Sequence, residues 1–213
     1  IVFFIAIAVF APLIAPYDPV KVDLSQALLS PSFEHIFGTD QFGRDIFSRV
    51  IYGARIEVGI ILLVTVISGA IGIAVGITAG YFGGVIDEIL MRITDIFLAF
   101  PNLILAMALS AMLGRGVFNA IIAISLVGWT VIARLSRAEA MKIKSLPYIE
   151  AIRALGAGNL RILLLHILPM CMSPVLVQLS LRMGSIILTA AGLGFLGLGA
   201  QPPTPEWGAI VSD

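Results

Sequence analysis

The chain has 213 residues, of which 59% are hydrophobic and 12% charged, and its mean hydropathy is +1.06. Soluble domains are about half apolar and a quarter charged, so this composition excludes an ordinary soluble domain and predicts a protein that places apolar surface in a bilayer. The formal net charge is zero, which gives no field that would attract nucleic acid. One cysteine, Cys171, cannot build a disulfide framework, and two histidines without a CxxC pattern predict no metal site.

The first apolar run, Ile1–Ala15, is shorter than the roughly 20 residues that a spanning helix needs. It has neither the basic start nor the small-residue cleavage pattern of a signal peptide, and it contains Pro12 and is followed by Pro16. We therefore interpret it as the tail of a first spanning helix and expect the chain to be incomplete at this end.

A long polar segment of mixed charge follows, Tyr17–Ile56. Within it, Thr39 or Asp40 can cap a short helix over Gly38–Gly53 that carries an i,i+4 charge pair and one apolar side. A helix of this kind is suited to lie on a membrane surface. The sequence therefore predicts a surface helix in this segment.

The rest of the chain contains four long apolar stretches. The last, Ile162–Ala200, is too long for one upright helix and predicts a span over about 169–190 followed by irregular structure. With the first partial helix this gives five spans, and the fold class expected is an all-α, polytopic helical bundle, because backbone exposed to lipid must satisfy its own hydrogen bonds. The other three stretches carry no formal charge: Val58–Ile86, Ile96–Gly114 and Gly116–Ala133.

Two features modify these spans. Gly69, Gly72, Gly76 and Gly80 form a stripe of small residues that allows two membrane helices to pack closely. Pro101 lies inside an expected span and predicts a kink there.

A basic segment, Arg134–Arg161, fixes the expected orientation. It contains six lysines and arginines against two glutamates, and cytoplasmic loops are enriched in basic residues. Counting spans from it places Tyr81–Glu88 inside, and both Gly114–Arg115 and Tyr17–Ile56 outside.

Within this basic segment, the sequence EAIRALG at 150–156, followed by HILP at 166–169, resembles the EAA loop of ABC importer permeases. The glycine follows the glutamate by six residues, and the proline follows the glycine by thirteen. In that family the loop forms a coupling helix that seats in a groove of the cytoplasmic ATPase. The alternative is an ordinary basic loop held by anionic lipid headgroups. The resemblance assigns the coupling contact to Glu150, Ala151, Ala154, Gly156 and Pro169.

A second motif, GTDQFGRD at 38–45, resembles the signature of the dipeptide/oligopeptide/nickel branch of these permeases. FLGLG at 195–199 and PPTPEWG at 202–208 resemble the same branch. The alternative for the first motif is a capped helix start with local ion pairs. The resemblance makes it a motif that faces an extracytoplasmic binding protein, through Gly38, Thr39, Asp40, Gly43, Arg44 and Asp45.

The resemblance implies one permease domain over 1–213, incomplete at both ends, with six spans in the intact chain and a prokaryotic plasma (inner) membrane location. It implies a heterodimer with a second related permease, two cytoplasmic ATPases and an extracytoplasmic substrate-binding protein. ATP and Mg²⁺ would be bound by the ATPases. This chain has no GxxxxGK[ST] loop, and we expect it to hold no cofactor and to be no enzyme itself.

The expected substrates are short peptides, with a nickel chelate as the alternative. The competing classes are an intramembrane enzyme and a channel or structural membrane subunit. Arg182 would cost about 2.5–3.5 kcal/mol if it faced lipid near mid-membrane, so we expect it to face the translocation pathway or a protein partner. Alternatively, a shorter span would leave it at the outer interface, where it could snorkel.

Overall fold

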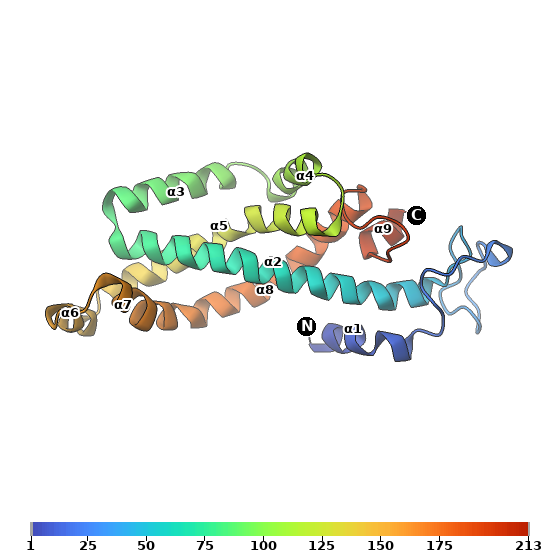
Figure 1. Ribbon diagram of the computed structural model, residues 1–213, viewed down its shortest axis with the longest axis horizontal. Coiled ribbons are helices and arrows are strands. Elements are labelled where there is room, and N and C mark those ends of the chain that lie inside the picture. The colour runs from blue at the N-terminus through green and yellow to red at the C-terminus, as the bar shows by residue number, and fades with distance from the viewer. Residues whose placement is uncertain (1, 213) are drawn as a thin grey trace. The chain divides into compact units, whose positions relative to one another are not determined.

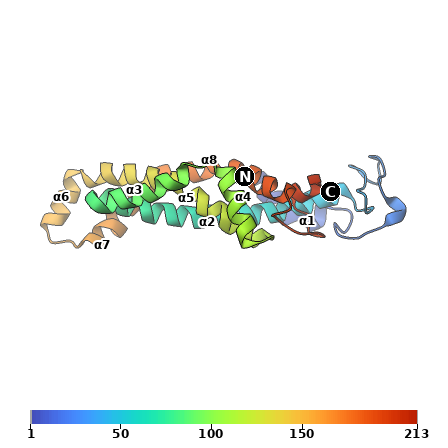
Figure 2. The same ribbon diagram turned by 90° about the horizontal axis from the view of Figure 1, so that it is seen from above.

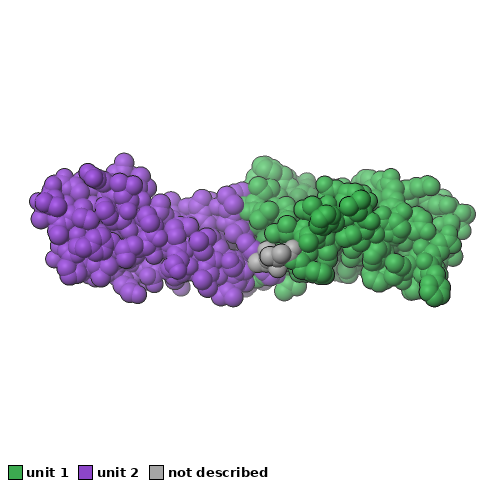
Figure 3. Space-filling model, turned by 90° about the horizontal axis from the view of Figure 1, so that it is seen from below, with its two compact units in different colours: residues 1–63, 107–124, 185–213 green, residues 64–106, 125–184 purple. Residues whose placement is uncertain are grey.

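The computed structural model describes residues 2–212, and regular structure in this range is helical apart from one isolated bridge between Thr39 and Asp45. The chain forms two compact units (Figure 3). Unit 1 comprises residues 1–63, 107–124 and 185–213, and unit 2 comprises residues 64–106 and 125–184.

The described helices carry the labels of Figure 1. They are α1 (Val2–Ile14), the 3₁₀ turn η1 (Leu24–Gln26), α2 (Ile46–Phe82), α3 (Gly84–Leu98), α4 (Asn102–Leu113), α5 (Val117–Lys144), α6 (Pro147–Ala154), α7 (Asn159–Ile162), the π-helical turn η2 (Leu163–Ile167), α8 (Leu168–Phe195) and α9 (Trp207–Ser212).

Three helical stretches are long and apolar enough to cross a membrane: α2, α5, and the continuous stretch Asn159–Phe195. Helices α3 and α4 together meet the same test but are bent by 90° at the break between them, and α1 is a shorter apolar helix. The expected fold class, an all-α polytopic membrane protein, is confirmed.

The break between α3 and α4 corrects the expected span Ile96–Gly114. The kink expected at Pro101 is a complete interruption of the helix, from Leu98 to Asn102. Proline lacks the N–H that a helix interior needs, and it disfavours α conformation in the residue before it, here Phe100.

Three further boundaries differ from expectation. Helix α5 continues to Lys144, so the polar loop expected from Arg134 begins only at Ser145. The first uncharged run was expected to extend to Ile86, but α2 ends at Phe82, because Gly83 and Gly84 both have positive φ and reverse the chain. The last span is longer than 169–190 because α7, the π turn and α8 form one helical stretch.

The surface helix expected over Gly38–Gly53 is wrong. Gly38 and Gly43 have φ of +74° and +70°, which is incompatible with a right-handed helix through them. Helix formation starts only at Ile46, where an Asp45 carboxylate oxygen accepts the Ser48 N–H at 2.7 Å and caps α2. The turns expected to lie on the membrane surface are the start of α2.

The glycine stripe packs inside unit 2 as expected. A Cβ at Gly72 would lie 2.6 Å from Ile132 Cβ, and a Cβ at Gly80 would lie 2.9 Å from Ala140 Cβ, both on α5. Such contacts leave no room for a side chain, so these glycines bring the α2 and α5 backbones together. Helix α3 is tied to α5 by two Arg137–Asp87 hydrogen bonds of 2.5 and 2.6 Å.

Candidate functional site

The short helix α6 contains most of the residues assigned to the coupling contact. Leu146 is extended, with φ −75° and ψ 138°, and Pro147 occupies the first helical position, where its missing N–H has no intrahelical partner to lose. Glu150 lies in the first turn and Arg153 in the last, so both charges complement the helix dipole. Pro147 therefore begins α6.

Gly156 terminates α6 through its backbone conformation. Its φ is +85°, its N–H donates to the Arg153 carbonyl at 3.0 Å, and the next N–H, of Ala157, donates to the Ile152 carbonyl at 3.2 Å. This pair of bonds around a left-handed glycine is a Schellman ending, which satisfies carbonyls that the helix end would leave open. Gly156 therefore ends α6 and turns the chain.

One side of α6 is anchored in the core of unit 2. Ile149 is fully buried and joins a cluster with Ile143 of α5, Ile162 of α7 and Ile167 of the π turn. The coupling residues Glu150, Ala151 and Ala154 remain exposed on the helix, and Leu155 just beyond it is 87% exposed. The fold therefore presents a small, fixed helix whose outer surface is covered by nothing in the described chain.

Tyr81, at the end of α2, stabilises the position of α6 relative to α2. Its side chain is buried, its hydroxyl donates to Asn159 Oδ1 at 2.7 Å, and the Arg153 guanidinium lies 5.7 Å from its ring centre. Tyr81 thus links α2 to the end of α6 and the start of α7. Nothing in the local sequence singles out this tyrosine, because its partners lie more than seventy residues away.

Pro169 does not lie on α6. It stands in the first turn of α8, directly after the π turn, and π turns are frequent at functional sites. The neighbouring residue is the link to α6: the Tyr148 hydroxyl donates to Met170 Sδ at 2.8 Å, and the Tyr148 ring packs edge-on against His166 at 6.2 Å.

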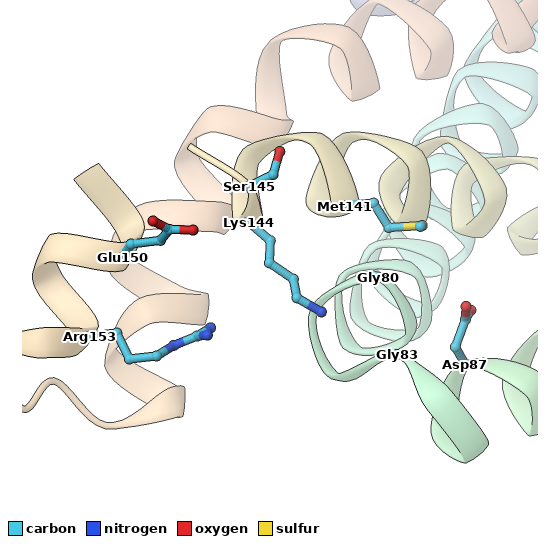
Figure 4. A pocket seen from close by; sticks show the side chains of 8 residues that line it. All are labelled: Gly80, Gly83, Asp87, Met141, Lys144, Ser145, Glu150 and Arg153. Carbon is cyan, nitrogen blue, oxygen red and sulfur yellow. The ribbon is translucent and has the colours of Figure 1, made fainter. Parts of the chain in front are cut away.

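A pocket of about 340 Å³ lies beside α6 (Figure 4). The side chains of Lys144 and Arg153 extend into it, and Glu150 borders it on the α6 side. Figure 2 shows α6, α7 and the start of α3 at the same end of unit 2. The pocket can accept an ionic group, and it is lined by Gly80, Gly83, Asp87, Met141, Lys144, Ser145, Glu150 and Arg153.

The motif at 38–45 forms a buried hydrogen-bonded network in unit 1. The Asp40 carboxylate accepts the Arg44 N–H at 3.0 Å and Arg44 Nε at 2.6 Å, and Arg49 Nε lies 3.5 Å from it. Asp45 pairs with His35 Nδ1 at 2.9 Å. Thr39 donates to the Gln26 carbonyl.

The two motif glycines permit this network. A Cβ at Gly43 would lie 2.6 Å from the Asp23 carbonyl carbon, so only glycine allows the two chain segments to approach. Hydrogen bonds from Ser25 hold the pKa of the Asp23 carboxyl below its usual range. The glycine conformation at Gly38 and Gly43 is what places Thr39, Asp40, Arg44 and Asp45 against their partners.

The exposed part of this outer segment consists of other residues. Thr39, Arg44 and Asp45 are each at most 4% exposed. Large apolar side chains emerge instead: Leu28 is 75% exposed, and Phe33 is fully exposed. Sequence reasoning missed them because isolated apolar residues in a polar loop carry no periodicity. The same surface includes Phe37 and Phe42.

Arg182 is half-buried on α8 and donates from Nη1 to the Gly128 carbonyl of α5, within unit 2. Its guanidinium therefore meets protein backbone on at least one side. Among residues 2–212, no three His, Cys, Asp or Glu side chains are grouped so that they could hold a metal ion.

Comparison with known proteins gives two family matches. Residues 72–213 match the family described as binding-protein-dependent transport system inner membrane component. Residues 1–31 match the N-terminal TM domain of oligopeptide transport permease C.

Curated relatives align with almost the whole chain. The dipeptide transport system permease protein DppC of Alkalihalophilus pseudofirmus is 46% identical over 210 residues, which are 99% of this chain and 69% of that protein. The probable D,D-dipeptide transport system permease protein DdpC of Escherichia coli K12 is 45% identical over 100% of this chain and 72% of its own length. The glutathione transport system permease protein GsiD of Escherichia coli O6:K15:H31 is 44% identical over 100% and 71%.

Proposed function

Because this chain belongs to the family of binding-protein-dependent transport system inner membrane components, we propose that it is a permease subunit of an ATP-driven importer of short peptides. The observation that carries the substrate class is the similarity, over nearly the full chain, to permeases named for dipeptide, D,D-dipeptide and glutathione transport. The names of these relatives favour peptides over the nickel chelate.

The geometry of α6 supports coupling to a separate ATPase. A helix with alanines at 151 and 154 is thin enough to enter a cleft, and Ile149 fixes it to the core of unit 2, so a force on the helix is transmitted to α5 and α7. Leu155 at 87% exposure is an apolar side chain that a partner would cover. ATP and Mg²⁺ would be held by that partner.

Exposed apolar surface also supports the two remaining partners, a second permease and the binding protein. Only 28% of an apolar segment within the stretch Asn159–Phe195 is buried within the chain. Apolar helix surface therefore remains for lipid and for a second, related permease. On the extracytoplasmic side, the network of Gly38–Asp45 holds a loop from which Leu28 and Phe33 project. We assign these exposed residues to contact with the binding protein, and the motif residues to positioning them.

Arg182 stays a candidate for the translocation pathway. Its Nη1 donates to the Gly128 carbonyl, which places the guanidinium beside α5. A charged group at this point of α8 can contact a polar substrate only if the pathway passes this side of α5 and α8.

The proposal is tested by purifying the chain with its partner subunits and measuring uptake of a labelled dipeptide into proteoliposomes. We expect uptake that requires both ATP and the binding protein, and that unlabelled dipeptide suppresses but a nickel chelate does not. Uptake of labelled nickel chelate in place of dipeptide would reverse the substrate assignment. Dipeptide entry at an equal rate without ATP would reverse the importer assignment in favour of a channel.

A further inference from the structure

Two glutamates are buried together in unit 1, and one of them, Glu206, belongs to the PPTPEWG motif at 202–208. Glu57 of α2 and Glu206, just before α9, are each 1% exposed. Acidic side chains are almost never fully buried unless a partner compensates their charge. The partners of these two groups therefore decide their protonation.

Glu206 is built as a carboxylate acceptor. Its Oε1 accepts the Gly208 N–H at 2.9 Å and its Oε2 accepts the Ala209 N–H at 3.1 Å, at the start of α9. Gly194 makes the space, since a Cβ there would lie 2.5 Å from Glu206 Cδ. Both Glu206 oxygens are therefore occupied by backbone N–H donors.

Glu57 has no such support. Both of its carboxylate oxygens are buried without a hydrogen-bond partner among the described residues. The groups that face it are the Glu206 carboxyl and the Trp207 backbone N–H, and neither reaches either oxygen in hydrogen-bond geometry.

Among the described residues of unit 1, no cation donates a hydrogen bond to the Glu57 carboxylate. Arg55, the nearest basic residue along α2, is exposed and rests on the Tyr52 ring at 6.0 Å. Arg44 and Arg49 face Asp40. The unit 1 segments 107–124 and 185–212 carry only Arg115 and Glu206 as charged residues, and α1 carries none.

We propose that Glu57 and Glu206 bind one proton between them, as a carboxylic acid and carboxylate pair that joins α2 to α9. Two ionised carboxylates side by side in a dry site repel each other, and the proton removes one charge. Glu57 takes the proton from solvent, because Glu206 already accepts two N–H bonds. The Glu206 carboxyl faces Glu57 and supplies the acceptor for the new Glu57 O–H.

The shared proton keeps α9 packed against α2. The neighbouring Trp207 donates from Nε1 to the Val50 carbonyl at 3.0 Å, and its ring edge lies 2.6 Å from where a Cβ of Gly53 would be. Loss of the proton would place two like charges beneath this contact and separate α9 from α2.

The folded pair holds a proton that a solvated Glu57 releases, so the unfolded state binds fewer protons and stability falls as pH rises.

The test compares Glu57→Gln with the wild-type protein, each purified in lipid with its partner subunits. Glutamine keeps the size and a hydrogen-bond donor but cannot lose a proton. We expect a carboxylic-acid C=O infrared band in the wild-type protein at neutral pH that E57Q lacks, and a melting temperature that falls toward alkaline pH in the wild type and stays level in E57Q.

Glu88→Gln is the matched control, because the Glu88 side chain is 74% exposed on α3. It should keep both the infrared band and the alkaline fall. Absence of the band from the wild-type protein, or an alkaline fall of equal size in E57Q, would overturn the shared proton. Because the infrared measurement on the wild type does not depend on a variant that folds, failure of E57Q to assemble would leave the proposal open to refutation by that measurement.

Discussion

At the scale of single residues, one backbone conformation determines how α6 ends. Gly156 has φ +85°, and no atom of the described chain lies within 4 Å of where a Cβ would be added. The positive φ therefore favours glycine here, because a residue with a β-carbon pays a free-energy cost of about 1 kcal/mol in the left-handed region. No neighbour within the chain needs the space, so any larger side chain would meet only a partner.

Because the backbone conformation at Gly156 favours glycine while the chain leaves space for a side chain, Gly156→Ala and Gly156→Asp should have different outcomes. G156A should insert normally and retain most transport, because its penalty of about 1 kcal/mol is local to the turn. G156D should insert equally well yet lose the ATPase or leave ATP hydrolysis uncoupled, because a charged side chain would wedge the two surfaces apart. Co-purification of the ATPase and peptide uptake measure both effects. Normal retention and uptake in G156D would remove the coupling contact from α6.

Arg182 gives the second prediction at this scale. Arg182→Leu should insert at least as well as the wild type, since it removes a charge that costs about 2.5–3.5 kcal/mol at the centre of a membrane helix. If the guanidinium also contacts substrate, uptake should fall sharply, and Arg182→Lys, which keeps the charge without the planar fork, should be intermediate. Unchanged uptake in R182L, measured with equal amounts of protein in the membrane, would leave Arg182 with only a structural role as a donor to the Gly128 carbonyl.

At the scale of elements, local signals in the sequence predicted the boundaries that depend on local chemistry. Pro147 and Gly156 delimit α6 because proline fixes its own φ and glycine tolerates the positive φ at which the helix ends. The expected surface helix failed because the turn at Gly43 exists to meet the Asp23 backbone, which lies twenty residues earlier in the chain. The pairing of Glu57 with Glu206 escaped prediction for the same reason, since no spacing rule links residues so far apart.

Charge also misplaced a boundary between elements. The basic residues from Arg134 onward suggested a loop, whereas α5 continues through them to Lys144. Arg134 and Arg137 are held there by Asp95 and Asp87 of α3, at 2.7 and 2.5 Å. A run of charges reports an aqueous environment or an ionic partner, and it does not by itself end a helix.

The glycines of α2 give a prediction at the element scale. A Cβ at Gly76 would lie 2.6 Å from Ser136 Cβ, whereas a Cβ at Gly59 on the same helix would meet nothing within 4 Å. Gly76→Ala should therefore force α2 and α5 apart and destabilise the protein by about 1–3 kcal/mol. Gly59→Ala should be neutral or stabilise by about 0.5–1 kcal/mol, because alanine is the better helix former. Unfolding in mixed detergent compares the two; an equal effect would contradict the packing role of Gly76.

At the scale of the whole molecule, the fold class and the family followed from composition and from four motifs, while the division into two compact units did not. Composition reports how much apolar surface a chain must place in lipid, and motifs report local geometry. Grouping of segments such as 1–63 with 185–213 depends on contacts between residues far apart in sequence. Side-chain patterns along a single helix do not encode these contacts.

The orientation in the membrane is the last prediction, and it concerns the whole chain. The excess of basic residues in Arg134–Arg161 predicts that α6 is cytoplasmic and that the segment Tyr17–Ile56 is extracytoplasmic. Gln41 and Leu155 are both exposed, and the native Cys171 is fully buried, so the unmodified chain should react little with a thiol reagent.

In intact cells, Gln41→Cys should react with a membrane-impermeant thiol reagent. Leu155→Cys should react only after the membrane is permeabilised, because the reagent must reach the cytoplasmic side. Permeabilised cells provide the control that both cysteines are accessible in the assembled protein. The opposite pattern, with Leu155→Cys labelled in intact cells and Gln41→Cys protected, would invert the topology. It would also separate α6 from any cytoplasmic ATPase, since a coupling helix must lie on the side where ATP is hydrolysed.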